Sequence, residues 1–155
     1  MKNETKVEQK SDREVVITRT FNAPARLVFE AWTTGELMQR WWVPKSAGIT
    51  LLSCEMDART GGSYRFVFKH PVEPGETMAF FGRYLEVTPH SRLVWTNDES
   101  GDAGQVSTLT LEDHGDTTRI VLHEVYPSAE AFEAGKGAYD GMPETFAQLD
   151  ELLVR

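Results

Sequence analysis

The chain has 155 residues and a formal net charge of −8 at neutral pH, with 40% hydrophobic and 26% charged residues. This length suits one domain, and no apolar run approaches the roughly twenty residues that would cross a bilayer. Nucleic acid and anionic lipid headgroups both bind through Lys and Arg, so the acidic balance disfavours them as partners. A small molecule or another protein is the expected partner.

The first 13 residues mix both charge signs and contain no apolar segment. A secretory signal needs such a segment, so we expect residues 1–13 to be a disordered lead-in. Cys54 is the only cysteine and cannot form an internal disulfide, which agrees with a reducing, cytoplasmic setting. We expect a single domain over residues 14–155, because no internal repeat or linker interrupts it.

Two helices are predicted to follow the first strand. In Glu14–Phe21, apolar residues alternate with polar ones, as in a strand with one buried face. Pro24 suits the first turn of a helix that reaches about Thr33. A second helix should start at once, because Thr33 and Glu36 have the spacing of a capping box.

Six further strands are predicted in the middle of the chain. Each is rich in strand-forming residues, and turn-forming residues separate one from the next. Short connections between successive strands indicate an antiparallel sheet, of about seven strands when the first is included. The six are Ile49–Met56, Ser63–His70, Met78–Val87, Leu93–Asn97, Gln105–Leu111 and Thr117–Val125.

Helical periodicity returns after Pro127. Ser128 is a suitable N-cap, but glycines then interrupt the pattern, so a short helix followed by a longer one is predicted. The longer helix should begin near Pro143 and carry an apolar stripe. The sheet must curl around this helix to bury the stripe, which gives an α+β fold. The stripe consists of Phe146, Leu149, Leu152 and Leu153.

Motifs spread over most of the chain carry a family resemblance. They begin with Ile17–Thr33, Glu36 and Trp41-Trp42-Val43-Pro44, continue with Gly61–Tyr64, Phe81–Pro89 and Arg92–Thr96, and end with Thr118-Arg119-Ile120, Gly141 and Leu149–Leu153. Together they resemble the activator of heat-shock protein 90 ATPase homologue family, which belongs to the START-like (SRPBCC, helix-grip) superfamily.

The resemblance implies a helix-grip fold, in which a curved antiparallel sheet wraps around a long C-terminal helix and encloses a cavity. Some relatives carry lipids or polyketides, a few catalyse reactions, and the eukaryotic namesake stimulates a chaperone ATPase, so the fold alone does not assign a function. Pro143 departs from the family pattern, because relatives usually have an uninterrupted helix there. We therefore expect a kink or break near this residue.

The candidate ligand-binding residues are mostly aromatic side chains on elements expected to touch the interior. Aromatic rings bury large areas, and a Tyr hydroxyl or Trp N–H can orient a ligand in an apolar cleft. The alternative is that these side chains only fill the core. The predicted set is Trp42, Tyr64, Phe66, Phe68, Phe80, Trp95 and His123, with Phe146 and Leu149 closing the cavity from the terminal helix.

No catalytic residue, metal site or cofactor site is predicted. His123 and Glu124 are adjacent on the last strand, so only one of them can face a cavity, and a single inward His is expected to be structural. Cys54 is expected to be an inert buried thiol. The sequence contains no metal-ligand spacing and no phosphate-binding glycine motif, so no cofactor is expected.

Three functions remain open. The first is non-enzymatic binding of a small apolar or amphipathic molecule in the cavity. The second is regulation of a chaperone or another ATPase, as in a stress response, through protein contacts on the convex face of the sheet. The third is a cyclase- or hydrolase-like enzyme that uses the same cavity with His123 or Glu124. A monomer and a homodimer fit the sequence equally well.

Overall fold

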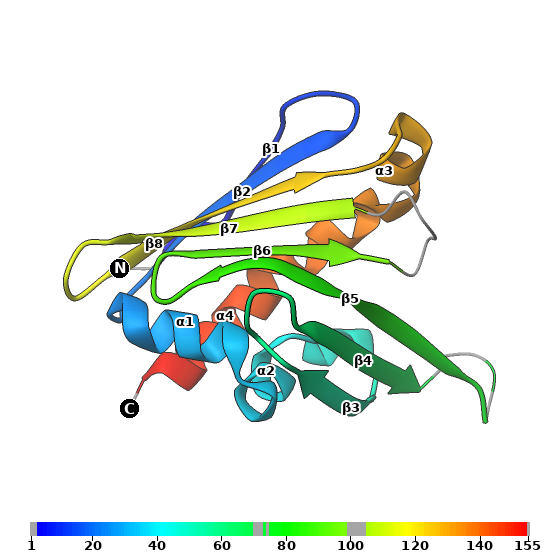
Figure 1. Cartoon of the computed structure of the whole chain (residues 1–155), viewed down its shortest axis with the longest axis horizontal. Helices are drawn as coiled ribbons and strands as arrows, with labels where there is room; N and C mark the ends of the chain where they lie inside the picture. The colour runs from blue at the N-terminus through cyan, green and yellow to red at the C-terminus, as the bar shows by residue number, and fades with distance from the viewer. Residues whose placement is uncertain (1–2, 70–72, 74, 99–104, 155) are drawn as a thin grey trace.

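The computed structural model of the chain describes residues 3–69, 73, 75–98 and 105–154 (Figure 1). His70, the predicted end of one strand, lies outside these residues. One sheet and a set of helices on its inner side make up the described part of the chain.

Within the described residues, eight strands form one antiparallel sheet with the order β1-β2-β8-β7-β6-β5-β4-β3. Consecutive strands from β3 to β8 are neighbours, while β2 pairs with β8 and so brings the N-terminal strand beside the last one. The sheet is therefore a meander from β3 to β8 that one long-range pairing extends with β2 and β1. The strands are β1 Lys6–Gln9, β2 Glu14–Phe21, β3 Leu51–Met56, β4 Ser63–Lys69, β5 Thr77–Thr88, β6 Arg92–Asn97, β7 Gln105–Asp113 and β8 Thr118–Val125.

Four α-helices and two 3-10 segments lie between and after the described strands. In Figure 1, α4 crosses the inner side of the sheet, and α1 and α2 lie beside it near the C-terminus. None of the described helices has the length and apolar character that a membrane crossing requires. The helical segments are α1 Ala25–Thr33, α2 Gly35–Trp41, η1 Lys45–Ala47, α3 Ala129–Gly135, η2 Lys136–Gly141 and α4 Met142–Leu153.

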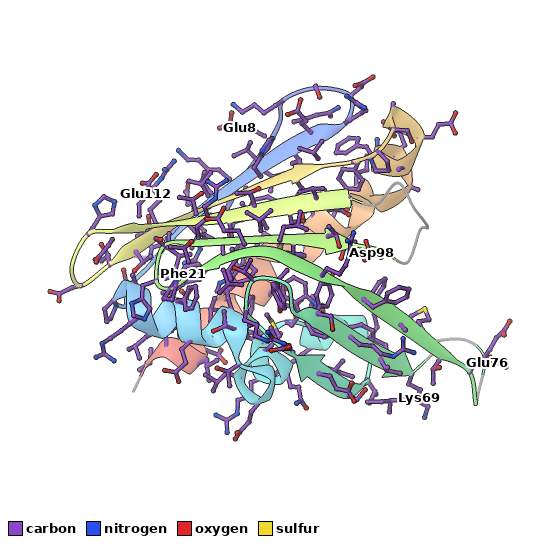
Figure 2. The ribbon with its side chains drawn as sticks, in the orientation of Figure 1. Glu8, Phe21, Lys69, Glu76, Asp98 and Glu112 are labelled. Carbon is purple, nitrogen blue, oxygen red and sulfur yellow. The ribbon has the colours of Figure 1, made fainter. Side chains whose placement is uncertain are left out.

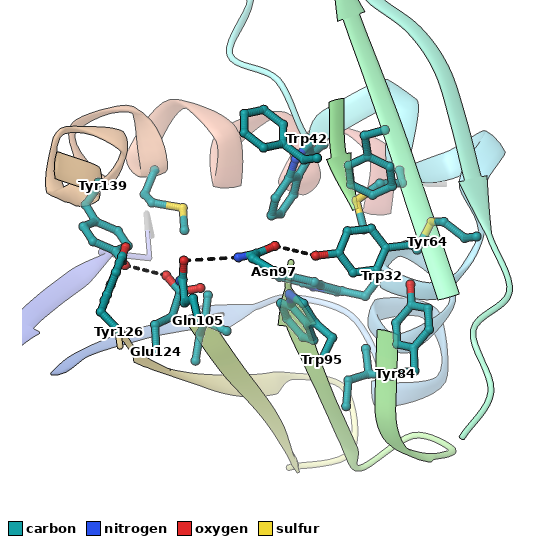
Figure 3. Close-up of a pocket in the computed structure, with 18 residues that line it drawn as sticks. Trp32, Trp42, Tyr64, Tyr84, Trp95, Asn97, Gln105, Glu124, Tyr126 and Tyr139 are labelled. Atoms are coloured by element: carbon teal, nitrogen blue, oxygen red, sulfur yellow. Dashed lines mark hydrogen bonds between the residues drawn. The ribbon is translucent and has the colours of Figure 1, made fainter. Parts of the chain in front are cut away.

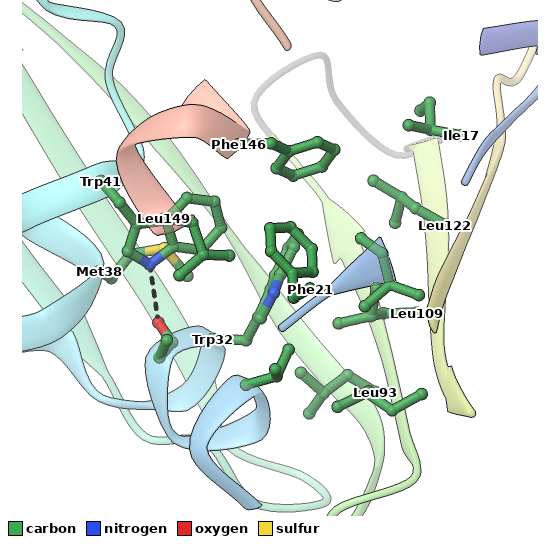
Figure 4. Packing of buried hydrophobic residues seen from close by; sticks show 14 of the residues in the cluster. Ile17, Phe21, Trp32, Met38, Trp41, Leu93, Leu109, Leu122, Phe146 and Leu149 are labelled. Carbon is green, nitrogen blue, oxygen red and sulfur yellow. Dashed lines mark hydrogen bonds between the residues drawn. The ribbon is translucent and has the colours of Figure 1, made fainter. Parts of the chain in front are cut away.

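The core lies between α4 and the sheet, as the apolar stripe predicts. Phe146 has no exposed surface, and its ring packs edge-on against Phe21 of β2 at 5.4 Å between centroids (Figure 4). Trp41 packs beside it and donates its indole N–H to the carbonyl oxygen of Ala31 at 3.0 Å. Full burial of one such ring contributes about 2–3 kcal/mol. Figure 2 shows that Phe21 points into the molecule, whereas the exposed side chain of Glu8 extends from the edge of the sheet.

Strand β5 belongs to two parts of the sheet. Its first half pairs with β4 and its second half with β6, and the register shifts between Tyr84 and Glu86. At Gly82 the carbonyl oxygen of Thr96 approaches so closely that a Cβ atom would lie 1.8 Å from it. Only glycine leaves room for this contact, which lets β5 cross from one partner strand to the other.

Strand β1 is a departure from the expected disordered lead-in. Residues 6–9 pair antiparallel with β2, with Lys6 opposite Thr18 and Gln9 opposite Val15. All four of its residues are exposed, so main-chain hydrogen bonds hold it to the edge of the sheet. A strand without a buried face has no apolar alternation, and this explains why the sequence pattern does not reveal it.

The helix starts are partly as predicted. Ser128 caps α3 by accepting a hydrogen bond from the Ala131 amide at 3.1 Å, and η2 provides the break before α4, with Pro143 in its first turn. The predicted capping box is wrong. Thr33 ends α1 and donates its hydroxyl to the carbonyl oxygen of Phe29 at 2.8 Å, while α2 begins after Thr34 without a side-chain cap.

Candidate functional site

A cavity of about 320 Å³ lies between the inner face of the sheet and the helical segments (Figure 3). Strands β3 to β8 supply one wall, and α1, α2, the end of α3, η2 and the first residue of α4 supply the other. Most of the lining is apolar or aromatic. It consists of Trp32, Met38, Trp42, Met56, Tyr64, Phe66, Phe80, Tyr84, Leu93, Trp95, Asn97, Gln105, Leu122, Glu124, Tyr126, Gly135, Tyr139 and Met142.

One end of the cavity is built from aromatic rings in edge-on and tilted contact. Trp32 of α1 is the central ring, with its centroid 5.9 Å from Trp42 and 6.1 Å from Trp95. Trp42 in turn contacts Phe66 of β4 at 6.2 Å, and Tyr64 contacts Tyr84 at 5.7 Å. Alternation along β4 and β6 places Tyr64, Phe66 and Trp95 on the inner face. The result is a rigid apolar wall suited to flat or aliphatic surfaces.

The other end of the cavity is polar and centres on Glu124 of β8. Its Oε1 accepts a hydrogen bond from the Tyr139 hydroxyl at 2.6 Å, and its Oε2 accepts one from the Ser107 hydroxyl at 2.7 Å. The hydroxyl oxygens of Tyr126 and Tyr139 are 2.5 Å apart. Burial raises the pKa of Glu124, although these hydroxyls and the Gln105 amide act in the opposite direction. Burial likewise raises the pKa of Tyr139.

Amide side chains connect the two ends of the cavity. Asn97 donates from Nδ2 to Oε1 of Gln105 at 3.2 Å, and its Oδ1 is hydrogen-bonded to the Tyr64 hydroxyl (Figure 3). The same hydroxyl lies 2.6 Å from the carbonyl oxygen of Thr96. A line of hydrogen-bonding groups therefore runs along the sheet side of the cavity, opposite the helical wall.

The cavity wall also contains an unsatisfied donor. Trp32 is 2% exposed, and its indole Nε1 has no hydrogen-bond partner among the described residues. Buried N–H groups without partners are uncommon in proteins.

Five of the nine predicted ligand-binding residues line the cavity, namely Trp42, Tyr64, Phe66, Phe80 and Trp95. The other apolar members do not. Phe68 is buried beside Phe80, at 5.3 Å between ring centroids, while Phe146 and Leu149 are fully buried in the core between α4 and the sheet. The terminal helix contributes only Met142, so the cavity is closed by η2 and Trp42 instead of the middle of α4.

His123 is the fourth predicted residue that lies outside the cavity. Its Nε2 is 3.1 Å from Oε1 of Glu14 on the outer face of the sheet, because inner and outer residues alternate along β8. The same alternation turns Glu124 inward. The sequence argument that only one of the two can face the cavity is correct, but the inward residue is the carboxylate.

Other lining residues were not predicted, and some of them carry a usable signal. Asn97 shares a strand face with Trp95 by alternation, and Glu124 shares one with Leu122. Tyr139 carries no such signal, because it lies in a 3-10 segment interrupted by glycines. Its position next to Glu124 follows from the path of the chain after β8.

The described residues contain no group of three His, Cys, Asp or Glu side chains that could hold a metal ion. Cys54 lies outside the cavity lining, and burial raises the pKa of its thiol to about 11. At that pKa the thiolate is scarce at neutral pH, so the side chain is a poor nucleophile.

A second hollow of about 600 Å³ borders α4 and the N-terminal segment, and its lining includes Arg19 and Asp150. The buried guanidinium of Arg19 donates to both carboxylate oxygens of Asp150, at 3.0 and 2.5 Å. Since this pairing neutralises the cation, the hollow offers no free charge to an anion. We therefore take the aromatic cavity as the candidate site.

Several solved structures share this fold. A protein from Rhodobacter sphaeroides is 24% identical with a TM-score of 0.84, and 97% of each chain is covered. A protein from Nitrosomonas europaea is 27% identical with a TM-score of 0.77, over 94% of this chain and 96% of that one. One from Staphylococcus epidermidis is 27% identical with a TM-score of 0.75, over 95% and 92%. A search of curated proteins finds no match.

The family comparison agrees with the motifs in the sequence. Residues 22–154 match the family model described as activator of Hsp90 ATPase homolog 1-like protein, a span that begins at the end of β2 and includes all four helices. The structural neighbours have the sheet and terminal helix of the START-like fold. The chain therefore belongs to the activator of Hsp90 ATPase homolog 1-like family, within the START-like (SRPBCC, helix-grip) superfamily.

Proposed function

We propose that the chain binds a small apolar or amphipathic molecule in the aromatic cavity and does not transform it. The cavity itself carries this proposal, because its volume of about 320 Å³ lies in the range of small-molecule sites. A water molecule occupies about 30 Å³ in the liquid, so there is room for on the order of ten water-sized groups. A molecule with one or two rings matches that space.

The lining supports the same proposal. Contact with three tryptophan rings, Trp32, Trp42 and Trp95, would remove most of the surface of such a guest from water. Each buried methylene-sized group contributes about 0.8 kcal/mol before the cost of immobilisation is subtracted. The rings already contact one another, so little side-chain freedom remains to be lost on binding.

Two neighbouring residues of β5 provide a matched test. Phe80 lines the cavity and is 40% exposed, while Phe81 points to the outer face beside Arg65 and is 37% exposed. We expect Phe80→Ala to weaken naphthalene binding about ten-fold, which is 1.4 kcal/mol, and Phe81→Ala to leave it unchanged. Equilibrium dialysis measures both. Equal affinities in the two variants, or no binding by the unmodified chain, would contradict the proposal.

The family description suggests a second candidate function, the stimulation of a chaperone ATPase. For this chain such a role would use a surface outside the cavity. An ATPase assay with the purified chain and an Hsp90-type chaperone separates the two functions, because stimulation that Phe80→Ala does not alter would favour regulation over ligand binding.

We also propose that the chain acts as one cytoplasmic domain, with β1 as an edge strand added to the sheet of residues 14–155. The lone thiol of Cys54, which has no disulfide partner, supports this location. Oligomeric state follows from light scattering of the purified chain, for which a monomer and a homodimer are the two outcomes compatible with the sequence.

A further inference from the structure

We propose that the ligand is a neutral, mostly apolar molecule with a hydroxyl group, and that this hydroxyl donates a hydrogen bond to Glu124 at the polar end of the cavity. This inference rests on the proposed function and narrows it. It names the polar group of the guest, and it excludes anionic guests such as fatty acids.

A count of hydroxyl protons shows what the polar end can offer. Tyr139 has a single hydroxyl proton and donates it to Oε1 of Glu124 at 2.6 Å. The 2.5 Å contact between Tyr126 and Tyr139 must then use the proton of Tyr126. Both tyrosine protons are thereby directed along the chain toward the carboxylate. This end of the cavity presents lone pairs, and a hydrogen-bond donor is the complementary group on a guest.

The carboxylate is held in place from behind. Ser107 has no exposed surface, and its hydroxyl donates to Oε2 of Glu124 at 2.7 Å from the neighbouring strand β7. The nearby Gln105 amide also acts to lower the pKa of this carboxylate. A carboxylate has about four lone-pair sites, so at least one remains for a guest after the bonds from Tyr139 and Ser107. The fixed orientation favours a donor that arrives from the cavity.

The charge distribution selects against anions. No Lys, Arg or His occurs among the described residues that line the cavity, and Glu124 is the only carboxylate there. A guest carboxylate would lose its hydration in an apolar setting without a counterion, and it would face oxygen lone pairs at the polar end. A cation would lose its hydration for a carboxylate that the Tyr139 and Ser107 hydroxyls already satisfy in part. A neutral hydroxyl meets neither cost.

Three compounds with the same two-ring skeleton test the inference on the unmodified chain. Naphthalene has no polar group, 2-naphthol has a neutral hydroxyl, and 2-naphthoate has a carboxylate. In equilibrium dialysis at pH 7 we expect 2-naphthol to bind about ten-fold more tightly than naphthalene, which is 1.4 kcal/mol. We expect 2-naphthoate to bind at least ten-fold more weakly than 2-naphthol.

Two variants that each replace one glutamate by glutamine test whether the difference in ligand affinity depends on Glu124. Glu124→Gln keeps the size of the side chain, and we expect it to lower 2-naphthol affinity about ten-fold, to raise 2-naphthoate affinity and to leave naphthalene unchanged. Glu112→Gln removes the same charge on the outer face of β7, where Glu112 pairs with Arg119 at 3.0 Å, and it should change none of the three affinities.

The outcomes separate this inference from the proposed function. If naphthalene and 2-naphthol bind the unmodified chain equally well, or if 2-naphthoate binds more tightly than 2-naphthol, the assignment of the hydroxyl to Glu124 is wrong while the carrier function stands. If none of the three compounds binds, the carrier function fails as well. The comparison of ligands needs no variant, so it decides the question even if Glu124→Gln does not fold.

Discussion

The carboxylate of Glu124 is buried and accepts hydrogen bonds from the Tyr139 and Ser107 hydroxyls. Burial outweighs these bonds and raises its pKa. An acid with a higher pKa in the folded state than in the unfolded chain holds its proton more tightly when folded. Its contribution to stability is therefore complete below the unfolded pKa near 4.5 and is lost as the pH rises through the folded pKa. The ionised form is tolerated at a cost to the free energy of unfolding.

We expect Glu124→Gln to become more stable relative to the unmodified chain as the pH rises from 4 to 8, because the variant has no charge to bury. Thermal unfolding followed by circular dichroism at several pH values gives the difference in Tm, and for a chain of this size about 2–4 °C corresponds to 1 kcal/mol. A difference in Tm that is constant over this range would contradict the expectation.

Glu14 supplies a control of opposite sign. The Ser11 hydroxyl and then His123 lower its pKa, so its contribution to stability is present above pH 4.5 and is lost as the pH falls through the lowered value. Glu14→Gln should accordingly be less stable than the unmodified chain at neutral pH, and the difference should shrink in acid.

For single residues, the sequence predicts the orientation of aromatic side chains better than that of polar side chains. Alternation correctly assigns Tyr64, Phe66 and Trp95 to the inner face. Between His123 and Glu124 it predicts opposite faces but does not say which faces inward, and the preference for a buried His over a buried carboxylate gave the wrong answer. The hydroxyl partners that make burial of Glu124 tolerable come from β7 and η2, and sequence alone does not show that they meet.

Among the elements, β5 depends most on a single residue. We expect Gly82→Ala to destabilise the fold by about 3 kcal/mol, because the new methyl group would overlap the Thr96 carbonyl oxygen and the ring of Tyr64. Urea unfolding provides the free energy. Gly137→Ala is the matched control, since nothing lies within 4 Å of its Cβ position, and its stability should be unchanged or slightly higher. Equal stabilities would contradict the close-packing argument.

The elements that the sequence predicts are those with a buried face. The predicted strands 14–21 and 93–97 match β2 and β6 closely, and the two-part C-terminal helix follows from the glycines and Pro143. Strand β1 has no buried face, and the start of α2 has no side-chain cap, so neither carries its usual signal. Likewise, the apolar stripe on α4 predicts that these side chains are buried. It does not show whether they pack in the core or line a cavity.

For the molecule as a whole, a guest that binds only the folded state should raise its stability. A ligand at 100 times its Kd contributes about 2.7 kcal/mol, which corresponds to an increase in Tm of about 5–10 °C for a chain of this length. We expect this increase with 2-naphthol, and a smaller one for Phe80→Ala at the same ligand concentration. Differential scanning fluorimetry measures both, and an unchanged Tm for the unmodified chain would argue against binding.

Helix α4 packs against the core, while η2 covers the polar end of the cavity, and this difference bears on how a guest would enter. Moving α4 away from the sheet would unpack Phe146 and Leu149, so that route is coupled to loss of the core. Moving η2 would separate the Tyr139 hydroxyl from Glu124 and Tyr126 and would leave Phe146 and Leu149 packed. A six-residue segment such as η2 can move on the nanosecond-to-microsecond timescale of loops. Binding and release of the guest through this route would not require global unfolding, so a very stable protein could still exchange its ligand quickly.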